Sequence, residues 1–186
     1  MAEKVTYGGI TFDSPDEREF YWWCEEAKAN ELIEDFGYQQ PTFRLADPVY
    51  EFIERTGAKG QKLKPKRKTV LQGITYTVDF HLIGIRKGVA VSEFLDVKPA
   101  FTLRDSTASL FSAIRKWVYQ RHSVLVFPVV PKELFGRTFA PANSLLTPKT
   151  RKPRKGYQDF LTVEQYVSEL ADDTTSFEGE PNEADE

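Results

Sequence analysis

Two stretches of the chain, residues 74–83 (ITYTVDFHLI) and residues 89–98 (VAVSEFLDVK), have the composition of consecutive β-strands. Side chains alternate across a strand, so Asp96 and Lys98 share one face of the second strand, while the apolar residues beside them enter the other face. A charged pair on one face of an otherwise apolar strand is a candidate functional site.

A short turn around Gly84 to Gly88 would make these stretches an antiparallel pair and bring Asp79 close to Asp96. Two carboxylates and an amine suit a divalent cation and a phosphodiester. The carboxylates hold the metal, and Lys98 steadies the attacking hydroxide or the developing charge. The alternative is that Asp96 and Lys98 form an exposed pair on an edge strand.

The composition is that of a globular protein. The chain has 186 residues, of which 40% are hydrophobic and 13% aromatic, enough for one domain with a proper core. No apolar run approaches the ~18 residues of a membrane span, so we expect no membrane partner. The single Cys24 excludes an internal disulfide and a cysteine-based zinc site, and fits a reducing cytoplasm.

The net charge of −3 conceals a segregation of charges. Residues 171–186 carry seven acidic and no basic residues, so residues 1–170 carry 25 basic and 21 acidic residues, a net charge of +4. We expect the acidic tail to be disordered, as a solubiliser or as a competitor for the basic segments when nucleic acid is absent.

The positive charge gathers in two segments without apolar periodicity, which we expect to be exposed, mobile loops. The first contains Lys59, Lys62, Lys64, Lys66, Arg67 and Lys68, and the second Lys149, Arg151, Lys152, Arg154 and Lys155. Such runs bind phosphate without reading sequence. The alternative for each is a solvated loop; two of them beside a candidate phosphodiesterase centre favour DNA contact.

The order of four motifs resembles the PD-(D/E)XK, or restriction-endonuclease-like, nucleases. Residues 77–80 (TVDF) followed by residues 95–99 (LDVKP) resemble the Asp…(Asp/Glu)-x-Lys signature. Residues 12–21 (FDSPDEREFY) resemble the Ser-x-x-Glu helix that opens the core. Residues 40–45 (QPTFRL) are similar to a Gln-Pro strand of small phage nucleases and transposon-end endonucleases. Val78 stands where the family often has proline, and Asp96 where glutamate is more usual.

The resemblance implies an α/β fold, a single domain with a central mixed β-sheet flanked by helices, whose core covers about residues 12–131. A basic, proline-rich extension (132–161) and a final helix (162–170) would complete the domain 1–170, before the disordered tail 171–186. Thr162 and Gln165 predict a capping box at the start of that helix. The residue pattern predicts strands at 40–45 and 49–56. It also predicts helices at about 14–34 and 106–122, and Gly37 would end the first of these helices. Residues 124–127 are continuously apolar, which predicts a strand buried on both faces.

Glu17 has two explanations. Ser14, Pro15 and Glu17 form a capping box, which accounts for the serine and the glutamate without chemistry. The resemblance instead makes Glu17 a metal ligand, with Glu19 on another side of the helix as second choice.

Other candidate residues carry weaker signals. Gln40 could hold a water or phosphate near the metal, and His81 shares the Asp79 face, although a structural role explains either. Glu93 falls on the face opposite Asp96. The resemblance suggests that Lys116 on the second helix contacts the substrate phosphate and that the Val97 carbonyl is a further metal ligand.

These observations predict an Mg²⁺-dependent endodeoxyribonuclease, in which Mn²⁺ substitutes for Mg²⁺. Its catalytic residues would be Glu17, Asp79, Asp96 and Lys98, with Glu17, Asp79, Asp96 and the Val97 carbonyl holding the metal. We expect a phage-encoded enzyme of the host cytoplasm that acts on branched or structured DNA; a junction resolvase would need two sites and thus a homodimer. The alternative is a non-catalytic DNA-binding or virion and packaging protein of nuclease-like fold.

Overall fold

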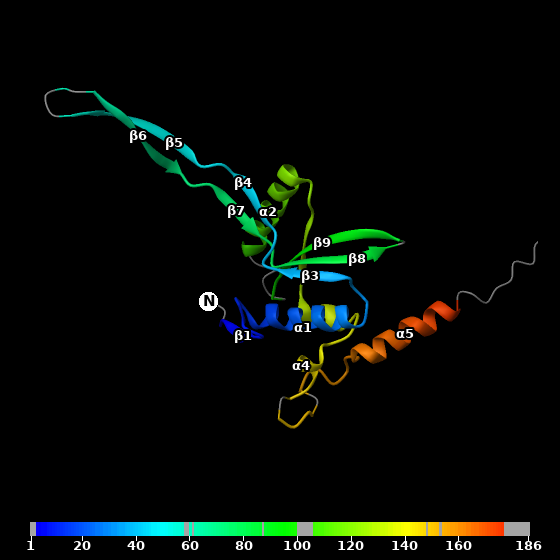
Figure 1. Ribbon diagram of the computed structural model, residues 1–186. Coiled ribbons are helices and arrows are strands. Elements are labelled where there is room, and N and C mark those ends of the chain that lie inside the picture. Colours follow the sequence, from blue (N-terminus) through cyan, green and yellow to red (C-terminus); the bar gives the residue numbers. More distant parts are fainter. Residues whose placement is uncertain are drawn as a thin grey trace, which may run out of the picture.

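A four-stranded mixed sheet lies at the centre of the structure, with its strands in the order β10-β9-β8-β3 (Figure 1). The computed structural model describes residues 3–57, 60, 62–86, 88–99, 106–147, 149–152 and 154–176. The sheet strands are β3 (Asp35–Tyr38), β8 (Phe80–Arg86), β9 (Val89–Val97) and β10 (Val126–Val129). The expected α/β architecture with a central mixed sheet is confirmed.

Strands β8 and β9 form the predicted antiparallel pair, with Phe80 opposite Leu95. Their turn is tighter than expected, because Gly84 lies within β8 and pairs with Val91. Gly88 precedes β9 at a φ of +75°, a left-handed conformation that glycine adopts readily.

A helix covers each face of this sheet (Figure 1). Helix α1 (Pro15–Ala29) packs on one face, where its Phe20 joins the same hydrophobic core as Leu95. Helix α2 (Ser106–His122) covers the other face, where Val118 and Val126 belong to a second core. Helix α2 is also the crossover that the parallel pairing of β9 with β10 requires.

The segment after β10 packs against α1. It contains α3 (Pro131–Phe135), α4 (Ala142–Leu145) and α5 (Val163–Ser176). Phe135, Phe139 and Val163 belong to the core of α1, and the Ala142 N–H donates to the Glu26 side chain at 2.7 Å. The extension is therefore part of one domain.

Helix α5 is longer than expected. Its predicted capping box is confirmed, because Thr162 N–H donates to the Gln165 side chain while Gln165 N–H donates to the Thr162 hydroxyl. The helix then continues past Leu170 to Ser176, so the first residues of the expected disordered tail are helical. The rest of the acidic tail, residues 177–186, lies outside the described residues.

A long two-stranded ribbon projects from the sheet (Figure 1). Its base pairs β4 (Thr42–Ala46) with β7 (Ile74–Thr77), and its outer part pairs β5 (Val49–Thr56) with β6 (Lys62–Leu71). We call residues 49–71 the arm. Every residue of β5 is exposed.

The arm corrects the expectation of a basic loop. Residues 62–68, in the first basic segment, lie in strand β6 because the alternating residues of β5 pair with them along its length. A run of lysines shows no apolar period, so the sequence pattern alone could not reveal the strand. Pro65 lies where the register shifts, a position that tolerates a missing N–H. Lys59 lies outside the described residues.

Two other expectations about element ends were wrong. Helix α1 ends at Ala29, because Asn30 caps it through the Glu26 carbonyl and Glu31 adopts a left-handed φ of 60°. Gly37 does not end the helix but lies within β3.

Strand β10 is not buried on both faces. It begins at Val126, and Leu125 and Phe127 are 52% and 44% exposed, because β10 is the edge of the sheet. A short hairpin of β1 (Val5–Tyr7) and β2 (Ile10–Phe12) precedes α1, with Gly8 and Gly9 at its turn. Among the described residues, no helix combines the length and apolar character needed to cross a membrane.

Candidate active site

Asp79 and Asp96 lie side by side at one end of the β8–β9 pair. Asp79 follows β7 and immediately precedes β8, while Asp96 is the penultimate residue of β9. The Val97 N–H donates to Asp79 Oδ2 at 2.7 Å, which fixes the carboxyl group against the neighbouring strand. The predicted proximity of the two aspartates is present.

The two carboxyl groups are coupled electrostatically. Burial raises the pKa of Asp79 to about 8, a hydrogen bond with Asp96 and the charges of Asp96 and Glu17 add to it, and the Val97 N–H opposes it. At neutral pH the raised pKa therefore favours the protonated form of Asp79. A divalent cation that displaces this proton would relieve the same repulsion, so these oxygen ligands fit Mg²⁺.

Asp96 is held by two further groups. Lys98 Nζ forms an ion pair with Asp96 Oδ1, and the Tyr76 hydroxyl donates to Asp96 Oδ2 at 2.5 Å. Burial and the negative charge of Asp96 raise the pKa of Tyr76, which keeps its hydroxyl protonated.

The alternative of an exposed ion pair on an edge strand is wrong. Strand β9 lies between β8 and β10, and Asp96 is 4% exposed. The Lys98 ammonium lies over the Phe111 ring of α2, 5.1 Å from its centroid. The Lys98 side chain is 24% exposed, but its partner carboxylate is almost fully buried. Burying a carboxylate has a high desolvation cost, which is unusual for a purely solubilising pair.

Glu17 is both a capping residue and a neighbour of the pair. Its N–H donates to the Ser14 hydroxyl at 3.1 Å, as the capping box predicts. The expected return bond from the Ser14 N–H is replaced by one from the Asp13 N–H at 3.3 Å. The Ser14 hydroxyl donates to Glu17 Oε1 at 3.1 Å and the Tyr38 hydroxyl to Oε2 at 2.7 Å.

The charge of this carboxylate reaches Asp79, whose pKa it helps to raise. Glu17 is 8% exposed. Within the described part of the chain, no three or more His, Cys, Asp or Glu side chains are arranged to hold one metal ion. Asp79 and Asp96 are thus the pair in direct contact, and Glu17 is the next carboxylate.

Three residues near these carboxylates were missed at the sequence level. They are Tyr38, Gln39 and Tyr76. The Gln39 amide donates to the Tyr38 hydroxyl at 3.1 Å and the Gln39 N–H donates to the Asp79 carbonyl at 2.7 Å. Tyr38 lies on β3, a strand that the sequence pattern did not indicate, so no signal pointed to it.

The Gln40 side chain makes no hydrogen bond to the carboxylates of Glu17, Asp79 or Asp96. Its side chain lies so close to Gly37 that a β-carbon there would fall 2.2 Å from Gln40 Nε2. It also lines a pocket with Tyr21 and Glu25 of α1, and it makes no hydrogen bond to a described residue.

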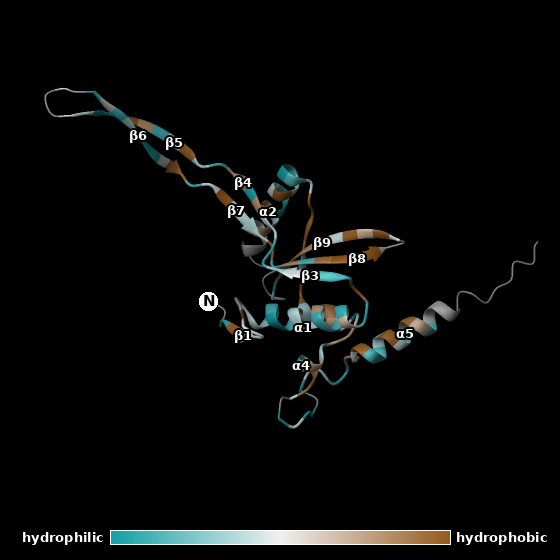
Figure 2. Cartoon of the chain, in the orientation of Figure 1, coloured by the Kyte–Doolittle hydropathy of each residue, from teal (hydrophilic) through white to brown (hydrophobic). Residues whose placement is uncertain are grey.

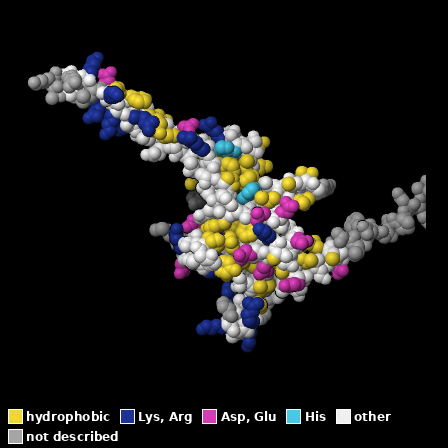
Figure 3. All heavy atoms as spheres, viewed as in Figure 1, with side chains coloured by type: hydrophobic (Ala, Val, Ile, Leu, Met, Phe, Trp, Pro, Cys, Tyr) yellow, Lys and Arg dark blue, Asp and Glu magenta, His cyan; other side chains and the backbone are white. Residues whose placement is uncertain are grey.

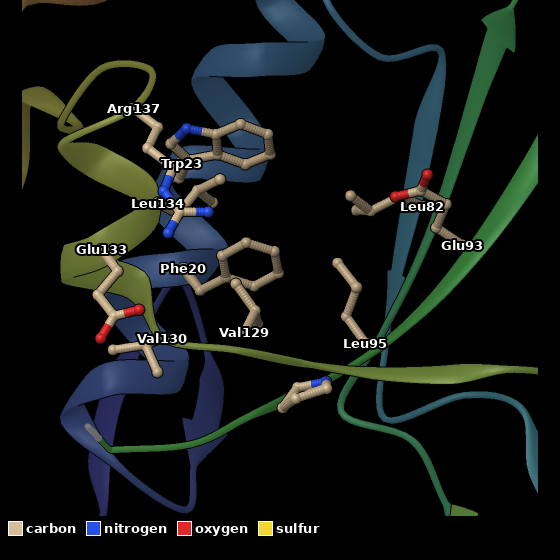
Figure 4. A pocket seen from close by; sticks show the side chains of 11 residues that line it. Phe20, Trp23, Leu82, Glu93, Leu95, Val129, Val130, Glu133, Leu134 and Arg137 are labelled. Atoms are coloured by element: carbon tan, nitrogen blue, oxygen red, sulfur yellow. The ribbon is translucent and has the colours of Figure 1, made fainter. Parts of the chain in front are cut away.

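His81 and Glu93 have structural surroundings. The His81 ring stacks on Phe94, with centroids 4.6 Å apart. Glu93 lies on the face opposite Asp96, as expected, and lines an apolar pocket with Phe20 and Leu95 (Figure 4). Glu19 accepts a hydrogen bond from the Tyr157 hydroxyl at 2.8 Å, on the side of α1 that meets the C-terminal segment.

Arg115, rather than Lys116, is the basic residue of α2 that approaches the site. Its charge lowers the pKa of Tyr76 against the larger opposing effects, and its guanidinium lies 5.7 Å from the centroid of Phe111. Lys116 is exposed and lines a surface pocket with Tyr119.

The second basic segment is remote in sequence from these residues and lies in an irregular stretch after α4. Its described candidates are Arg151, Lys152, Arg154 and Lys155. Lys152 and Arg154 are held by backbone bonds to Thr147 and Leu145. The segment is therefore an exposed basic loop, as expected.

A family model described as a protein of unknown function (DUF1064) matches residues 1–120. The chain belongs to this family. The matched region contains Glu17, Asp79, Asp96, Lys98 and the arm, whereas β10 and the second basic segment lie outside it. No curated protein and no solved structure matches the chain.

Proposed function

We propose that this protein is a metal-dependent endodeoxyribonuclease that hydrolyses DNA phosphodiester bonds. The observation that carries the proposal is the Asp79–Asp96 pair, in which Asp96 is buried and Asp79 partly buried, with Lys98 ion-paired to Asp96 Oδ1. The resemblance to the PD-(D/E)XK nucleases supports it, because these residues occupy the positions of that family's signature.

Asp79 and Asp96 would hold the metal, with Glu17 and the Val97 carbonyl as further candidates. When bound, Mg²⁺ or Mn²⁺ would lower the pKa of a water molecule and neutralise charge on the scissile phosphate. Tyr76 keeps Asp96 oriented by donating to Oδ2. Lys98 would donate to an oxygen of the reacting phosphate, where negative charge develops.

The arm supports DNA as the substrate. Lys64, Lys66, Arg67 and Lys68 lie on β6, which leads through β7 directly to Asp79. The arm and the carboxylate pair therefore belong to one continuous stretch of chain. A phosphate backbone bound along the arm would be led towards the pair, which favours long or branched DNA over short oligonucleotides.

A DNA-binding or packaging protein without turnover is the second candidate, and the exposed basic arm favours it equally. The test is incubation of the purified protein with plasmid, linear, single-stranded and four-way-junction DNA in Mg²⁺, Mn²⁺ or EDTA. We expect cleavage with either metal, preferentially of the junction, and none in EDTA.

The variants Asp79→Asn, Asp96→Asn and Lys98→Ala should each abolish cleavage and leave DNA binding largely intact, since the site acts on the transition state. Asp47→Asn is the matched control, because that carboxylate is 76% exposed and paired with Arg44. Binding without cleavage in the wild-type protein would establish the second candidate instead.

A further inference from the structure

The arm has two different faces. Register pairs Tyr50 with Thr69 and Phe52 with Arg67, and directly opposed side chains share a face. One face therefore carries two aromatic rings and a guanidinium. The other carries Glu51 and Ile53 with the lysines opposite them, Lys68 and Lys66.

The aromatic face is exposed to solvent. Phe52 is 69% exposed and Tyr50 41% exposed. The Arg67 guanidinium lies over the Tyr50 ring, 4.3 Å from its centroid, so ring and cation form a cation–π contact. Exposing apolar rings to water is unfavourable, and burial against a partner would remove this cost. The exposed aromatic rings of the projecting ribbon therefore indicate a binding surface.

The charge of the arm identifies the partner. Its described residues include six basic ones (Arg55, Lys62, Lys64, Lys66, Arg67 and Lys68) and two acidic ones, Glu51 and Glu54. Figure 3 shows the Lys and Arg side chains interleaved with hydrophobic ones along the arm, and Figure 2 shows the same alternation along its ribbon. A second copy would bring the same excess of positive charge, whereas a nucleic acid brings the opposite charge.

We propose that Tyr50, Phe52 and Arg67 form a platform on which unpaired DNA bases stack. Every base has a π-face, so stacking on aromatic rings and arginine planes binds without reading sequence. In an intact duplex those faces are covered by neighbouring base pairs. The platform would thus select DNA in which unpaired bases adjoin a duplex, while Lys66 and Lys68 on the other face hold phosphates.

This inference rests on the proposed action on DNA and narrows the substrate class. Twelve residues separate Arg67 from Asp79. At about 3.3 Å per residue the platform lies at most about 40 Å from the carboxylate pair, roughly twelve nucleotides along a strand. The preferred substrate therefore carries its unpaired bases within roughly twelve nucleotides of the cleaved bond.

The experiment measures the binding of the full chain in EDTA, where no cleavage occurs. Three DNAs of equal length serve as probes: a single strand, a duplex with a gap of several nucleotides, and a fully paired duplex. Anisotropy gives the dissociation constants, and 2-aminopurine in the gap reports stacking through quenched fluorescence.

Phe52→Ala should weaken binding of the single strand and the gapped duplex by at least about fivefold, the low end of base–aromatic stacking. It should change binding of the paired duplex by less than about twofold and leave the salt dependence unchanged. Phe52→Trp should restore binding and quenching, whereas Phe52→Leu, apolar but without a ring, should not. The double variant Lys66→Gln/Lys68→Gln should weaken the binding of all three DNAs by the same factor.

Equal losses on all three probes, or no loss, would overturn the platform, as would wild-type binding by Phe52→Leu. A shift of Phe52→Ala from dimer to monomer in sedimentation would show that the face is an interface between copies. Phe52 is exposed, so the substitution should not affect folding, and thermal unfolding checks this. If the protein does not cleave DNA in Mg²⁺ but still stacks unpaired bases, the proposed nuclease activity is wrong and the proposed stacking platform is retained.

Discussion

The hydroxyl of Tyr76 donates a hydrogen bond to Asp96 Oδ2 at 2.5 Å. Tyr76 lies on β7, the strand that continues the arm, and Asp96 lies on β9 of the central sheet. The projecting ribbon is therefore anchored on the carboxylate of the candidate site.

Removing that hydrogen bond should impair cleavage without impairing DNA binding. Tyr76→Phe keeps the partly buried ring and removes the donor that orients Asp96. We therefore expect a loss of roughly 10- to 100-fold in cleavage rate, the usual effect of removing a partner of a metal ligand. Cleavage assays with saturating DNA measure it. Tyr119→Phe, at a 52% exposed position of α2, is the control and should retain wild-type rates. An unimpaired Tyr76→Phe would mean that Asp96 needs no orienting partner.

The raised pKa of Asp79 predicts a pH-dependent stability in EDTA. Unfolded, its carboxyl loses a proton near pH 4, whereas burial keeps it protonated in the folded protein up to about pH 8. Between these values the folded state binds more protons than the unfolded state, so this group lowers stability as the pH rises. Asp79→Asn is neutral throughout and should gain stability relative to wild type between pH 4 and pH 8.

Denaturant unfolding of both proteins at several pH values measures this difference. At pH 4 the two should be nearly equal, and the advantage of the asparagine variant should level off above pH 8. Asp47→Asn should show no such trend, since that carboxylate is exposed. A constant difference across the pH range would show that Asp79 titrates normally.

The two roles of Glu17 can be separated by its amide. In Glu17→Gln the amide oxygen can keep the bonds from Tyr38 and Asp13, and the amide N–H can donate to the Ser14 hydroxyl. The variant should therefore unfold within about 1 kcal/mol of wild type. It should lose most Mg²⁺-dependent cleavage, because a neutral amide is a poorer ligand than a carboxylate.

Two companions complete this test. Glu17→Ala should lose both cleavage and about 0.5–2 kcal/mol of stability. Ser14→Ala removes the cap acceptor and leaves the carboxylate, so it should lose stability and keep cleavage. Normal cleavage by Glu17→Gln would show that Glu17 only caps the helix and accepts the hydrogen bond from Tyr38. Glu19 would then be the next residue to test.

The basic residues of β6 should supply affinity that depends on salt. Neutralising Lys64, Lys66, Arg67 and Lys68 together should weaken binding to all DNA sequences alike. The slope of log K against log salt should fall by about 0.9 for each lost phosphate contact. Binding isotherms at several salt concentrations give the slope. Lys28→Gln, paired with Asp35 on the body, is the control, and an unchanged slope in the quadruple variant would make β6 a solvated surface only.

Features that depend on neighbours in sequence could be predicted. The alternation in residues 89–98 placed Asp96 and Lys98 on one face, because the side chains of a strand alternate whatever surrounds it. The hairpin-length gap placed Asp79 beside Asp96. The serine and glutamate spacing located the start of α1, and Thr162 with Gln165 that of α5, because capping involves groups within one turn of helix.

Features that depend on distant partners appeared only in the tertiary structure. The lysine run of β6 became a strand because β5 pairs with it, and Tyr76 reached Asp96 because the chain bends at Val78 and Asp79. The burial of Asp96, which rules out an exposed pair, required β10 to return beside β9 across α2. Local geometry determines which face a side chain takes, whereas long-range packing alone determines what it meets there.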